Sequence, residues 1–511
     1  MILSKAVTPD EMREIEKELI ERLGMPALLL MENAARGAAE TIIRENAPCT
    51  ALVFCGMGNN GGDGFAIARH LVTSGFNVKV YIAGAPEQVK GDAGTNLDIL
   101  VRLGLKPVYL DERTNIAEIF TPDEKCIILD ALLGTGLSRN VDGLLEGVIS
   151  AINGSGHKVY AVDIPSGIDG KNGHIMGTAV KADTTVTFHE AKIGHLLYPG
   201  REYTGKLVIK NLGIKGLEDK ANREALFPDN TGKVLCQRDP DANKSFSGRV
   251  AVIAGSEGLA GAGELCVRAA LRCGAGMVTA GVPDALMQVY QAKFTEAMTY
   301  ALPSRDGKIC IEALPAINSL FSGKTAAAIG PGLGKSEDLQ ELIIKIMEGC
   351  NIPLVIDADG LNNLAPAAEC LKKRKAPTIV TPHPIEMARL MHAEPKTVLD
   401  APLEAAERFA KDHGVIVALK CGTNIACAPD GRTTFCLSGN AGMATGGSGD
   451  VLTGAILALL GSGMDAYDAA RYGCHINGLA GDAAAKVTGM KGMLPSDTVE
   501  NLPHIINQLT I

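Results

Sequence analysis

Short apolar runs alternate with helical patterns along the first part of the chain. Thr8, Pro9 and Glu11 form a capping-box signature, and apolar residues follow at helical spacing from Ile15 to Leu23, so the sequence predicts a helix there. A second helix is predicted over 27–45 and a further helical pattern covers 65–73. Apolar runs that suit buried strands lie at 51–55, 78–82, 126–130, 159–163, 184–188 and 206–209. This alternation predicts an α/β fold with a parallel sheet.

A second series of the same kind occupies the rest of the chain. Between 214 and 247 the pattern breaks into charged and loop-forming stretches, which predicts a domain boundary there. Apolar runs then recur at 249–254, 326–329, 354–356, 378–380 and 415–419. We therefore expect two α/β domains, over 1–220 and 225–511, without an internal repeat that links them.

Composition and charge narrow the function. The chain has 511 residues, of which 46% are hydrophobic and 21% charged, and no apolar run approaches the roughly 18 residues of a membrane span. The net charge is −9 and Lys and Arg form no block, which argues against nucleic acid or an anionic membrane as a partner. The first residues lack the pattern of a secretory signal, so we expect a cytoplasmic protein. The 59 glycines favour a small molecule with phosphate groups as the ligand.

A Gly-rich loop follows the first predicted strand. It runs from Gly56 to Gly64 and leads into a helix, where backbone N–H groups can hold a phosphate. Asn59, Asn60 and Asp63 add oxygen atoms that suit a hard cation or a ligand. The alternative is a tight turn in which Asn and Asp adopt left-handed backbone angles.

Carboxylates also stand at the ends of two later strands. Asp130 ends one apolar run, and Asp163 ends the next, three residues before Ser166. An Asp in this position is costly unless it caps a turn, holds a cation or moves a proton. We expect Asn60, Asp130 and Ser166 to meet around one cation, with Asp163 free as a proton carrier. Taken one at a time, each Asp also fits a capped turn.

The second half carries a longer Gly-rich loop. Gly447, Ser448 and Gly449 lead directly into an apolar helix, so their N–H groups can form an anion hole for a transferring phosphoryl group. Asp450 follows at the helix start, where it can take the proton of an attacking hydroxyl. The alternative role of Asp450 is a favourable charge at the helix dipole.

Other strand ends of this half add polar groups to the same edge. Gly-rich stretches lie at 254–263 and 330–334, and Asp357 and Asp359 end another strand. His383 and Glu386 follow the next strand, and Lys420 follows the one after, where it suits a nucleotide phosphate. A structural histidine and a solvated lysine at a turn are the alternatives.

These residues, taken in order, resemble those of the bifunctional NAD(P)H-hydrate repair enzymes. The motifs that carry the resemblance span nearly the whole chain: Asn59-Asn-Gly-Gly-Asp-Gly64, 130–137, Val162-Asp-Ile-Pro-Ser-Gly-Ile-Asp169, 330–334, Asp357-Ala-Asp359, Thr381-Pro-His383 and the stretch from Gly442 to Asp450 with Val-Leu after it. The resemblance implies two three-layer αβα domains. The first is a Rossmann-like epimerase of the YjeF N-terminal type, and the second is a ribokinase-like dehydratase.

The resemblance further implies roles in the first domain, which interconverts the R and S hydrates of NADH and NADPH (NADHX and NADPHX). Asn60, Asp130 and Ser166 are similar to potassium ligands, and Asp163 to a substrate-binding acid–base residue. The implied hydrate contacts are Asn59, Asn60, Gly61, Gly62, Asp63, Gly134, Thr135, Gly136, Leu137, Ser138, Arg139 and Asn140.

In the second domain the resemblance implies phosphorylation of the C6 hydroxyl of the S hydrate, after which phosphate leaves and the dihydropyridine re-forms. Asp450 is then the base, and Gly447, Ser448 and Gly449 are the anion hole. Ala262, Gly334 and His383 are implied hydrate contacts. Lys420, Cys421, Gly422, Thr423 and Asn424 are implied to bind the adenine nucleotide, which we expect to be ADP with a magnesium ion.

Two positions depart from the family pattern. Ile385 stands where the family usually has Gly after His-Pro, and Cys421 stands where it commonly has another Gly. Both changes concern loop geometry, and the second also concerns nucleotide preference. Both catalytic Asp candidates are unaffected.

Two rival interpretations stay open from the sequence. The Gly-rich loop with Asp450 suits a kinase of any small alcohol, and the first half also suits a non-catalytic nucleotide-binding or oligomerisation module. A homo-oligomer is expected, with Leu28 to Met31 as a candidate contact.

Overall fold

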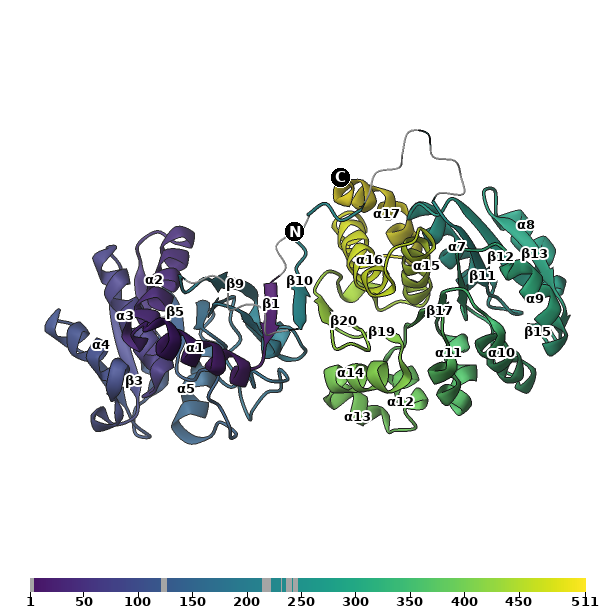
Figure 1. Cartoon of the computed structure of the whole chain (residues 1–511). Coiled ribbons are helices and arrows are strands. Elements are labelled where there is room, and N and C mark those ends of the chain that lie inside the picture. Colours follow the sequence, from purple (N-terminus) through teal and green to yellow (C-terminus); the bar gives the residue numbers. More distant parts are fainter. Residues whose placement is uncertain (1–3, 121–125, 214–221, 231, 236–240, 242–246) are drawn as a thin grey trace. The chain divides into compact units, whose positions relative to one another are not determined.

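The computed structural model describes residues 4–120, 126–213, 222–230, 232–235, 241 and 247–511 (Figure 1). The chain forms two compact units, one over Ser4–Ala221 and one that includes Asn222–Ile511. Among the described residues, none of the helices has the length and apolarity to span a membrane. The linker stretches expected at 215–224 and 239–247 lie largely outside the described residues.

The first unit is built on a sheet with the strand order β4-β3-β2-β5-β6-β7-β9, in which all pairs are parallel. The strands of the unit are β1 (Ser4–Val7), β2 (Thr50–Cys55), β3 (Asn77–Ala83), β4 (Val108–Leu110), β5 (Cys126–Ala131), β6 (Lys158–Val162), β7 (Thr184–Phe188), β8 (Ala191–Lys192) and β9 (Lys206–Lys210). Of these, β1 and β8 lie outside this sheet and pair with each other. Its α-helices are α1 (Pro9–Leu23), α2 (Ala27–Glu45), α3 (Asn59–Thr73), α4 (Gly91–Arg102), α5 (Gly143–Gly154) and α6 (Gly200–Thr204). Short 3-10 helices are η1 (Pro86–Gln88), η2 (Ile116–Ile119) and η3 (Ile193–His195).

Helices cover both faces of this sheet. Alternate residues of β2 point to opposite sides: Val53 belongs to one apolar core with α1, α2, α3 and α4, whereas Leu52 and Phe54 belong to another with α5. The unit is therefore a three-layer αβα arrangement, which confirms the fold expected for the first domain. The capping box of α1 is also confirmed, because the Glu11 N–H donates to the Thr8 hydroxyl and the Thr8 N–H to the Glu11 carboxylate.

The second unit has a larger sheet with the order β13-β12-β11-β16-β17-β18-β19-β20-β21-β10. Its strands are β10 (Arg223–Leu226), β11 (Arg249–Ile253), β12 (Met277–Pro283), β13 (Met298–Leu302), β14 (Ser304–Arg305), β15 (Lys308–Ile309), β16 (Ala326–Ile329), β17 (Leu354–Ile356), β18 (Thr378–Val380), β19 (Ile416–Leu419), β20 (Asn424–Cys427) and β21 (Thr433–Cys436). Its α-helices are α7 (Ala260–Arg272), α8 (Met287–Lys293), α9 (Leu314–Phe321), α10 (Glu337–Gly349), α11 (Asp359–Leu364), α12 (Pro384–Leu390), α13 (Pro395–Asp400), α14 (Pro402–His413), α15 (Ser448–Gly461), α16 (Ala466–Thr488) and α17 (Pro495–Leu509). Short 3-10 helices are η5 (Asp284–Leu286), η6 (Ile311–Ala313), η7 (Ala365–Lys373) and η8 (Ala441–Met443).

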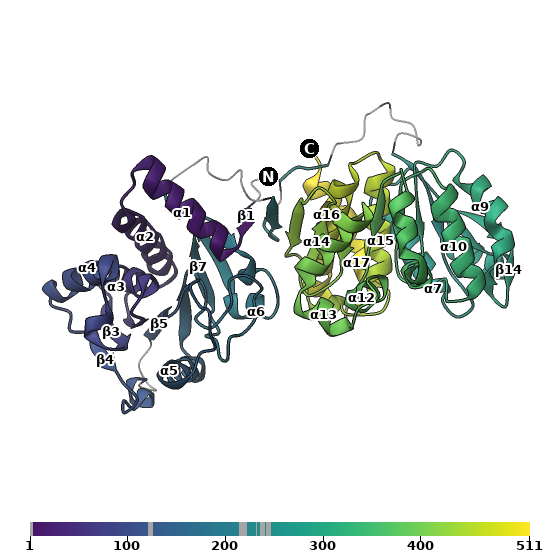
Figure 2. The same cartoon turned by 60° about the horizontal axis from the view of Figure 1, so that its bottom comes forward.

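Helices again lie on both sides of the sheet. One apolar core joins Val250 and Val252 of β11 to α7, α15, α16 and α17. The opposite face carries α10 to α14, and α14 packs on β19 and β20 (Figures 1 and 2). The strands from β13 through β19 are parallel, and β20 pairs antiparallel with both of its neighbours. The second expected αβα domain is thus confirmed.

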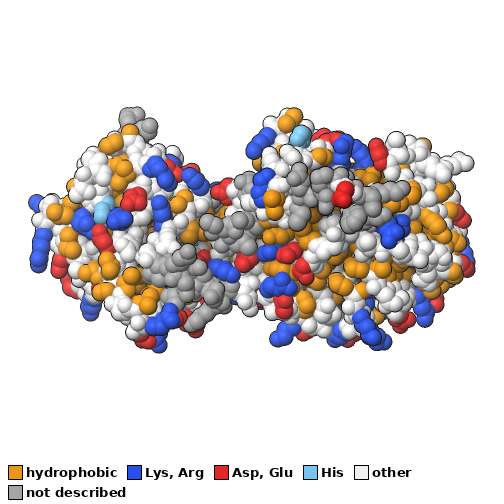
Figure 3. Space-filling model, turned by 45° about the horizontal axis from the view of Figure 1, so that its top comes forward, with side chains coloured by type: hydrophobic (Ala, Val, Ile, Leu, Met, Phe, Trp, Pro, Cys, Tyr) orange, Lys and Arg blue, Asp and Glu red, His pale blue; other side chains and the backbone are white. Residues whose placement is uncertain are grey.

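On the surface drawn in Figure 3, Lys and Arg side chains are interspersed with Asp and Glu, and neither sign forms an extended patch of its own.

Candidate active sites

The first candidate site lies at the carboxyl ends of β2, β5 and β6. The helices that follow β2 and β3 pack on one face of the sheet, whereas α5, which follows β5, packs on the other. The chain therefore changes direction between β2 and β5, which are neighbours in the sheet. In open parallel sheets, ligands bind in the crevice at such a switch point.

The Gly-rich loop after β2 is tighter than its sequence predicts. Helix α3 begins at Asn59, so Asn59 to Asp63 form its first turns rather than a loop before residue 65. The reason is a close backbone crossing: a Cβ on Gly61 would lie 2.0 Å from the Gly56 carbonyl oxygen. A Cβ on Gly56 would in turn lie 1.9 Å from the Leu132 carbonyl oxygen, so the loop also packs directly on the end of β5.

The Asn60 carboxamide is buried without a hydrogen-bond partner. Neither its Oδ1 nor its Nδ2 is paired, although the residue is only 9% exposed. A Cβ on Gly134 would lie 3.2 Å from the Asn60 Cβ, so the chain after β5 passes beside this side chain. An unpaired buried amide is costly, which indicates that a ligand or ion completes its hydrogen bonds.

Asp130 accepts three hydrogen bonds at the end of β5, two of them from Ser166. The Ser166 hydroxyl and N–H donate to the Asp130 carboxylate at 2.6 and 2.8 Å, and the Leu132 N–H donates to it at 3.2 Å. The Leu133 N–H donates to the Ser166 hydroxyl oxygen at 2.8 Å, which fixes the chain that leads to Gly134. Burial raises the pKa of Asp130 to about 6, although the bonds from Ser166 oppose the shift.

The sequence pattern predicts a free Asp163, and this is wrong: its carboxylate is paired with Lys192. Lys192 Nζ lies 2.7 Å from Asp163 Oδ1, and the Thr187 hydroxyl donates to the same oxygen at 3.0 Å. Burial alone would raise the pKa of Asp163, but the Lys192 ammonium outweighs it and holds that pKa below its ordinary value. Asp163 has a left-handed backbone with φ of 64°, a conformation that is uncommon for residues other than glycine.

Two further carboxyl groups face this ion pair. Burial, Asp163 and Glu16 raise the pKa of Asp63 well above its ordinary value. Burial also raises the pKa of Glu16, with Lys192 opposing and Asp163 adding to the shift. Sequence reasoning missed Glu16 and Lys192. A lone lysine inside the apolar stretch Ala191-Lys-Ile193 was the one signal that pointed to a buried ion pair.

The remaining residues expected at this site lie on the segment between β5 and α5. Gly136, Ser138, Arg139 and Asn140 are exposed, and Gly134, Thr135 and Leu137 are partly buried. The segment is tied down at its end, where the Val141 N–H donates to the Met176 carbonyl at 2.9 Å.

The second candidate site lies at the carboxyl ends of β17, β18 and β19, under the start of α15. Lys420 Nζ lies 2.5 Å from Asp357 Oδ1 and 3.8 Å from Glu386 Oε2. The Thr453 hydroxyl of α15 donates to the other Asp357 oxygen at 2.7 Å. A Cβ on Gly449 would lie 3.1 Å from Lys420 Nζ, so the helix start passes directly over the ammonium.

Asp450 is the partly buried carboxyl group at this helix start. Burial, Asp357, Asp359 and Glu386 raise its pKa to about 7, and Lys420 opposes the shift. Its carboxylate makes no hydrogen bond to any other described residue, unlike that of Asp357. Asp450 is thus a carboxyl group whose protonation changes near neutral pH and which is open to a ligand.

His383 serves as the cap of α12. Its Nδ1 accepts the N–H groups of Ile385 and Glu386 at 3.1 and 3.3 Å, and the Glu386 carboxylate accepts the His383 N–H at 2.9 Å. Nδ1 therefore carries no proton, which leaves Nε2–H as the donor. Ile385, which departs from the family pattern, is exposed on this first turn.

The loops after β11 and β16 meet beside this site. The Gly334 N–H donates to Asp359 at 2.9 Å, and a Cβ on Gly332 would lie 3.0 Å from the Ala262 Cβ. The structure therefore brings Ala262 and Gly334 close to Asp359 at one edge of the sheet.

The turn after Lys420 is held by its own side chains. The Cys421 N–H donates to Asn424 Oδ1 at 3.3 Å, and the Cys421 thiol donates to the Thr423 carbonyl at 2.8 Å. The thiol therefore takes part in the turn geometry at the position where the family commonly has Gly.

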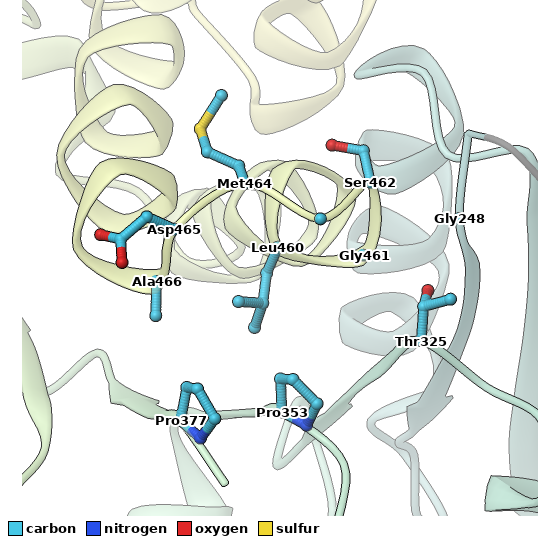
Figure 4. Close-up of a pocket in the computed structure, with 11 residues that line it drawn as sticks. Gly248, Thr325, Pro353, Pro377, Leu460, Gly461, Ser462, Met464, Asp465 and Ala466 are labelled. Carbon is cyan, nitrogen blue, oxygen red and sulfur yellow. The ribbon is translucent and has the colours of Figure 1, made fainter.

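No group of three or more His, Cys, Asp or Glu side chains suited to a metal ion occurs within the described residues. Asn60, Asp130 and Ser166 include only one of these four residue types, so this finding does not bear on the cation site expected there. Two hollows of the second unit lie away from these sites. One, of about 360 Å³, is lined by Gly248, Thr325, Pro353 and Pro377, which precede β11, β16, β17 and β18 at the opposite edge of the sheet (Figure 4).

Comparison with known proteins covers both units. The family model described as YjeF-related protein N-terminus matches residues 27–194, and the model described as NAD(P)H-hydrate dehydratase matches 250–504. The bifunctional NAD(P)H-hydrate repair enzyme Nnr of Moorella thermoacetica is 36% identical, over 98% of this chain and 97% of its own length. The enzyme of the same name from Escherichia coli is 33% identical, over 98% of this chain and 93% of its own. The ADP/ATP-dependent NAD(P)H-hydrate dehydratase of Bacillus subtilis, crystallised with ATP and Mg²⁺, matches 54% of this chain and 94% of its own at 25% identity, with a TM-score of 0.47.

Proposed function

The chain belongs to the family of bifunctional NAD(P)H-hydrate repair enzymes, and on that basis we propose which residues carry each of its two reactions. The enzyme restores NADH and NADPH that have added water across the C5–C6 bond of the nicotinamide ring. Its epimerase interconverts the R and S hydrates, and its nucleotide-dependent dehydratase returns the S hydrate to NAD(P)H. We assign the epimerase to residues 1–220 and the dehydratase to residues 225–511.

In the epimerase, the hydrated ring binds at the switch point between β2 and β5. The Gly-rich start of α3 supplies N–H groups for the dinucleotide phosphates, and Gly134 to Asn140 form the facing wall. Asp163 is the acid–base residue at C6. Its pairing with Lys192 supports this role, because a carboxylate that stays ionised can accept a proton at neutral pH.

A potassium ion is proposed beside Asn60, Asp130 and Ser166. The fit rests on the buried and unpaired Asn60 carboxamide, next to a carboxylate and a hydroxyl oxygen. Oxygen ligands with a single carboxylate suit a hard ion of low charge. Asn60, Asp130 and Ser166 would hold such an ion, which would supply positive charge for an anionic ligand, and Ser166 fixes the segment that leads to Gly134.

In the dehydratase, Asp450 removes the proton of the C6 hydroxyl as that oxygen attacks the terminal phosphate of the nucleotide. The N–H groups of Gly447, Ser448 and Gly449 stabilise the charge on the transferring phosphoryl group. Phosphorylation converts hydroxide, a poor leaving group, into phosphate, and the loss of phosphate with a C5 proton restores the dihydropyridine. The products are NAD(P)H, AMP and phosphate when ADP is the donor.

The observation that carries this assignment is the position of Asp450. It is an unpaired carboxyl group at the N-terminus of α15, next to Gly449, at which a Cβ would lie 3.1 Å from Lys420 Nζ, and its pKa is shifted by both Lys420 and Asp357. Lys420 and the turn to Asn424 are proposed to hold the nucleotide, and Ala262, Gly334 and His383 the hydrate. A magnesium ion is expected with the nucleotide phosphates, as in other phosphoryl transfers.

The test is recovery of dihydronicotinamide absorbance from a mixture of R and S hydrates, with ADP or ATP and Mg²⁺ present. We expect complete recovery by the native chain, recovery of only the S fraction by Asp163→Asn, and no recovery by Asp450→Asn. A stable phosphorylated hydrate would instead support a small-alcohol kinase. Conversion of the R hydrate by Asp163→Asn at the native rate would support a non-catalytic first unit.

The preference for ADP over ATP follows from the fused architecture and is part of the proposal. The expected site of action is the cytoplasm. A homo-oligomer is proposed. Of the candidate contact Leu28 to Met31, Leu28 and Leu29 are exposed, whereas Leu30 and Met31 are buried in the unit and are not available for it. Sedimentation of Leu29→Glu beside the native chain tests the proposal.

A further inference from the structure

Three carboxyl groups and one ammonium surround the epimerase site. Asp163, Asp63 and Glu16 influence one another electrostatically, and Lys192 is the one cation that acts on all three. Lys192 is 2% exposed and makes three hydrogen bonds, to Asp163, to the Thr187 hydroxyl and to the Phe188 carbonyl at 2.7, 2.9 and 3.1 Å. Its three N–H groups are therefore fully used, and only Asp163 receives direct neutralisation.

Asp63, unlike Asp163, has no cation paired with it among the described residues. Its carboxyl group makes no hydrogen bond within the described part of the chain, and Asn60 one turn earlier leaves both amide atoms unpaired. The charged groups that face it are Asp163 after β6, Glu16 of α1 and Lys192 of β8. Burial and the carboxyl groups of Asp163 and Glu16 raise the pKa of Asp63 well above its ordinary value, whereas Lys192 holds the pKa of Asp163 below its ordinary value.

The sheet order puts the segments that carry these two carboxyl groups on either side of β5. Asp63 belongs to the helix after β2, Asp163 follows β6, and β5 lies between these two strands. The proposed function places the hydrated ring over the end of β5, and so between a segment that carries a protonated carboxyl group and one that carries an ionised carboxyl group. Groups whose environments push their pKa values apart are suited to separate acid and base roles.

We propose that Asp63 is a second catalytic residue of the epimerase, which protonates the departing C6 hydroxyl while Asp163 accepts a proton from the incoming water. This inference rests on the proposed function of the first unit and assigns Asp63 a chemical role beyond contact with the hydrate.

The reaction balances without a redox partner. The C6–O bond breaks, the hydroxyl leaves as water with the Asp63 proton, and the N1 lone pair forms a C6–N1 double bond. Water then adds to the other face of C6 and gives its proton to Asp163. The net change is one water exchanged and one proton moved from Asp63 to Asp163, and solvent returns that proton.

The first experiment compares Asp63→Asn and Asp63→Glu with the native chain in conversion of the R hydrate. Excess chain with inactive epimerase, Asp163→Asn, converts the S product to NAD(P)H and reports the rate. Asp98→Asn, which removes an exposed carboxylate from α4 of the same unit, is the matched control.

We expect Asp63→Asn to lower kcat for the R hydrate by about 10²- to 10⁴-fold with little change in KM, the usual range for loss of a general acid. A KM near the native value shows that the variant site is folded. Asp63→Glu should restore part of kcat, and Asp98→Asn should match the native chain. A raised KM with native kcat would overturn the proposal, since it describes a binding residue only.

Two further readouts separate acid catalysis from a structural role. The native rate should fall at alkaline pH as Asp63 ionises, and Glu16→Gln should move that fall to lower pH, because Glu16 raises the pKa of Asp63. In water labelled with ¹⁸O, the epimerised product should carry the label at C6. An alkaline limb unmoved by Glu16→Gln, or unlabelled product, overturns the proposal. If the native chain converts no R hydrate at all, the proposed epimerase function has failed instead.

Discussion

If Asp450 is the base of the dehydratase, as proposed, its protonation should make the reaction depend on pH near neutrality. Burial and the carboxylates of Asp357, Asp359 and Glu386 raise its pKa to about 7, against an ordinary value of 3.8. A base must be ionised to accept the hydroxyl proton, so activity has to rise as pH rises through this pKa.

The size of the effect follows from the pKa. With a pKa of about 7, about a tenth of Asp450 is ionised at pH 6 and about nine-tenths at pH 8. We therefore expect kcat/KM for the S hydrate to rise about tenfold over this range. Lys420 lowers the pKa of Asp450, so Lys420→Met should displace the rise to higher pH.

Ionisation of Asp450, which should increase activity as pH rises, should decrease the stability of the folded unit. Its folded pKa of about 7 lies above the ordinary 3.8, so ionisation costs the folded state at most about 4 kcal/mol, and the unit loses stability as pH rises from about 4 to 7. Asp450→Asn, which we expect to be inactive, should unfold at a higher temperature than the native chain at pH 8, and the difference should vanish below pH 4.

The assay is initial recovery of dihydronicotinamide absorbance from pure S hydrate with saturating nucleotide, at a series of pH values and constant ionic strength. Thermal unfolding is followed through the transition that ADP displaces, which belongs to the second unit. Asp412→Asn, an exposed carboxylate on α14, is the control for both measurements. A flat pH profile between 6 and 8, or an Asp450→Asn chain less stable than native at pH 8, would refute the reasoning.

Three further predictions concern the first unit. Lys192→Met should move the acidic limb of R-hydrate conversion to higher pH, because the ammonium lowers the pKa of Asp163, and should leave S-hydrate dehydration unchanged; a rate profile with an unmoved limb contradicts this. Asn60→Ala should abolish any advantage of KCl over NaCl in the epimerase rate, measured at matched ionic strength, since it removes a proposed potassium ligand; retention of the advantage would speak against the site. Gly61→Ala would put a Cβ 2.0 Å from the Gly56 oxygen, so we expect loss of epimerase activity with dehydration intact; native epimerase rates would mean that the crossing can relax.

The main strands could be predicted because each is a short apolar run buried on both faces. The runs at 184–188, 326–329, 354–356 and 378–380 match β7, β16, β17 and β18 at both ends. Sequence reasoning missed β12, in which Thr279, Gly281 and Pro283 interrupt the apolar pattern, although the strand is buried between β11 and β13. Its burial comes from its neighbours and not from its own sequence.

The site residues were predictable where they belong to a loop motif, and not where they act as partners. Asp163 and Asp450 stand in recognisable stretches at element ends. Lys192 lies 29 residues beyond Asp163, and only the sheet brings the two together. Glu16 lies between Met12 and Leu19 on the buried side of α1, but a carboxylate in an amphipathic helix normally faces water, so its role was not recognised from the sequence.

The imidazole cap of α12 also makes the dehydratase unit sensitive to acidic pH. The Nδ1 lone pair of His383 is occupied by two backbone N–H groups, so the ring has no lone pair left to compete with Asp450 for the substrate proton. A proton on Nδ1 would displace both N–H groups and free the first turn of α12. Burial, followed by the charges of Lys420 and Arg389, lowers the pKa of His383, which delays this event to more acidic solution. As pH falls below about 6.5, the ordinary pKa of histidine, the unfolded chain takes up a proton that the folded His383 does not, and the free energy of unfolding decreases. Acid inactivation of the dehydratase should therefore begin at the first turn of α12, while the hydrophobic cores remain intact.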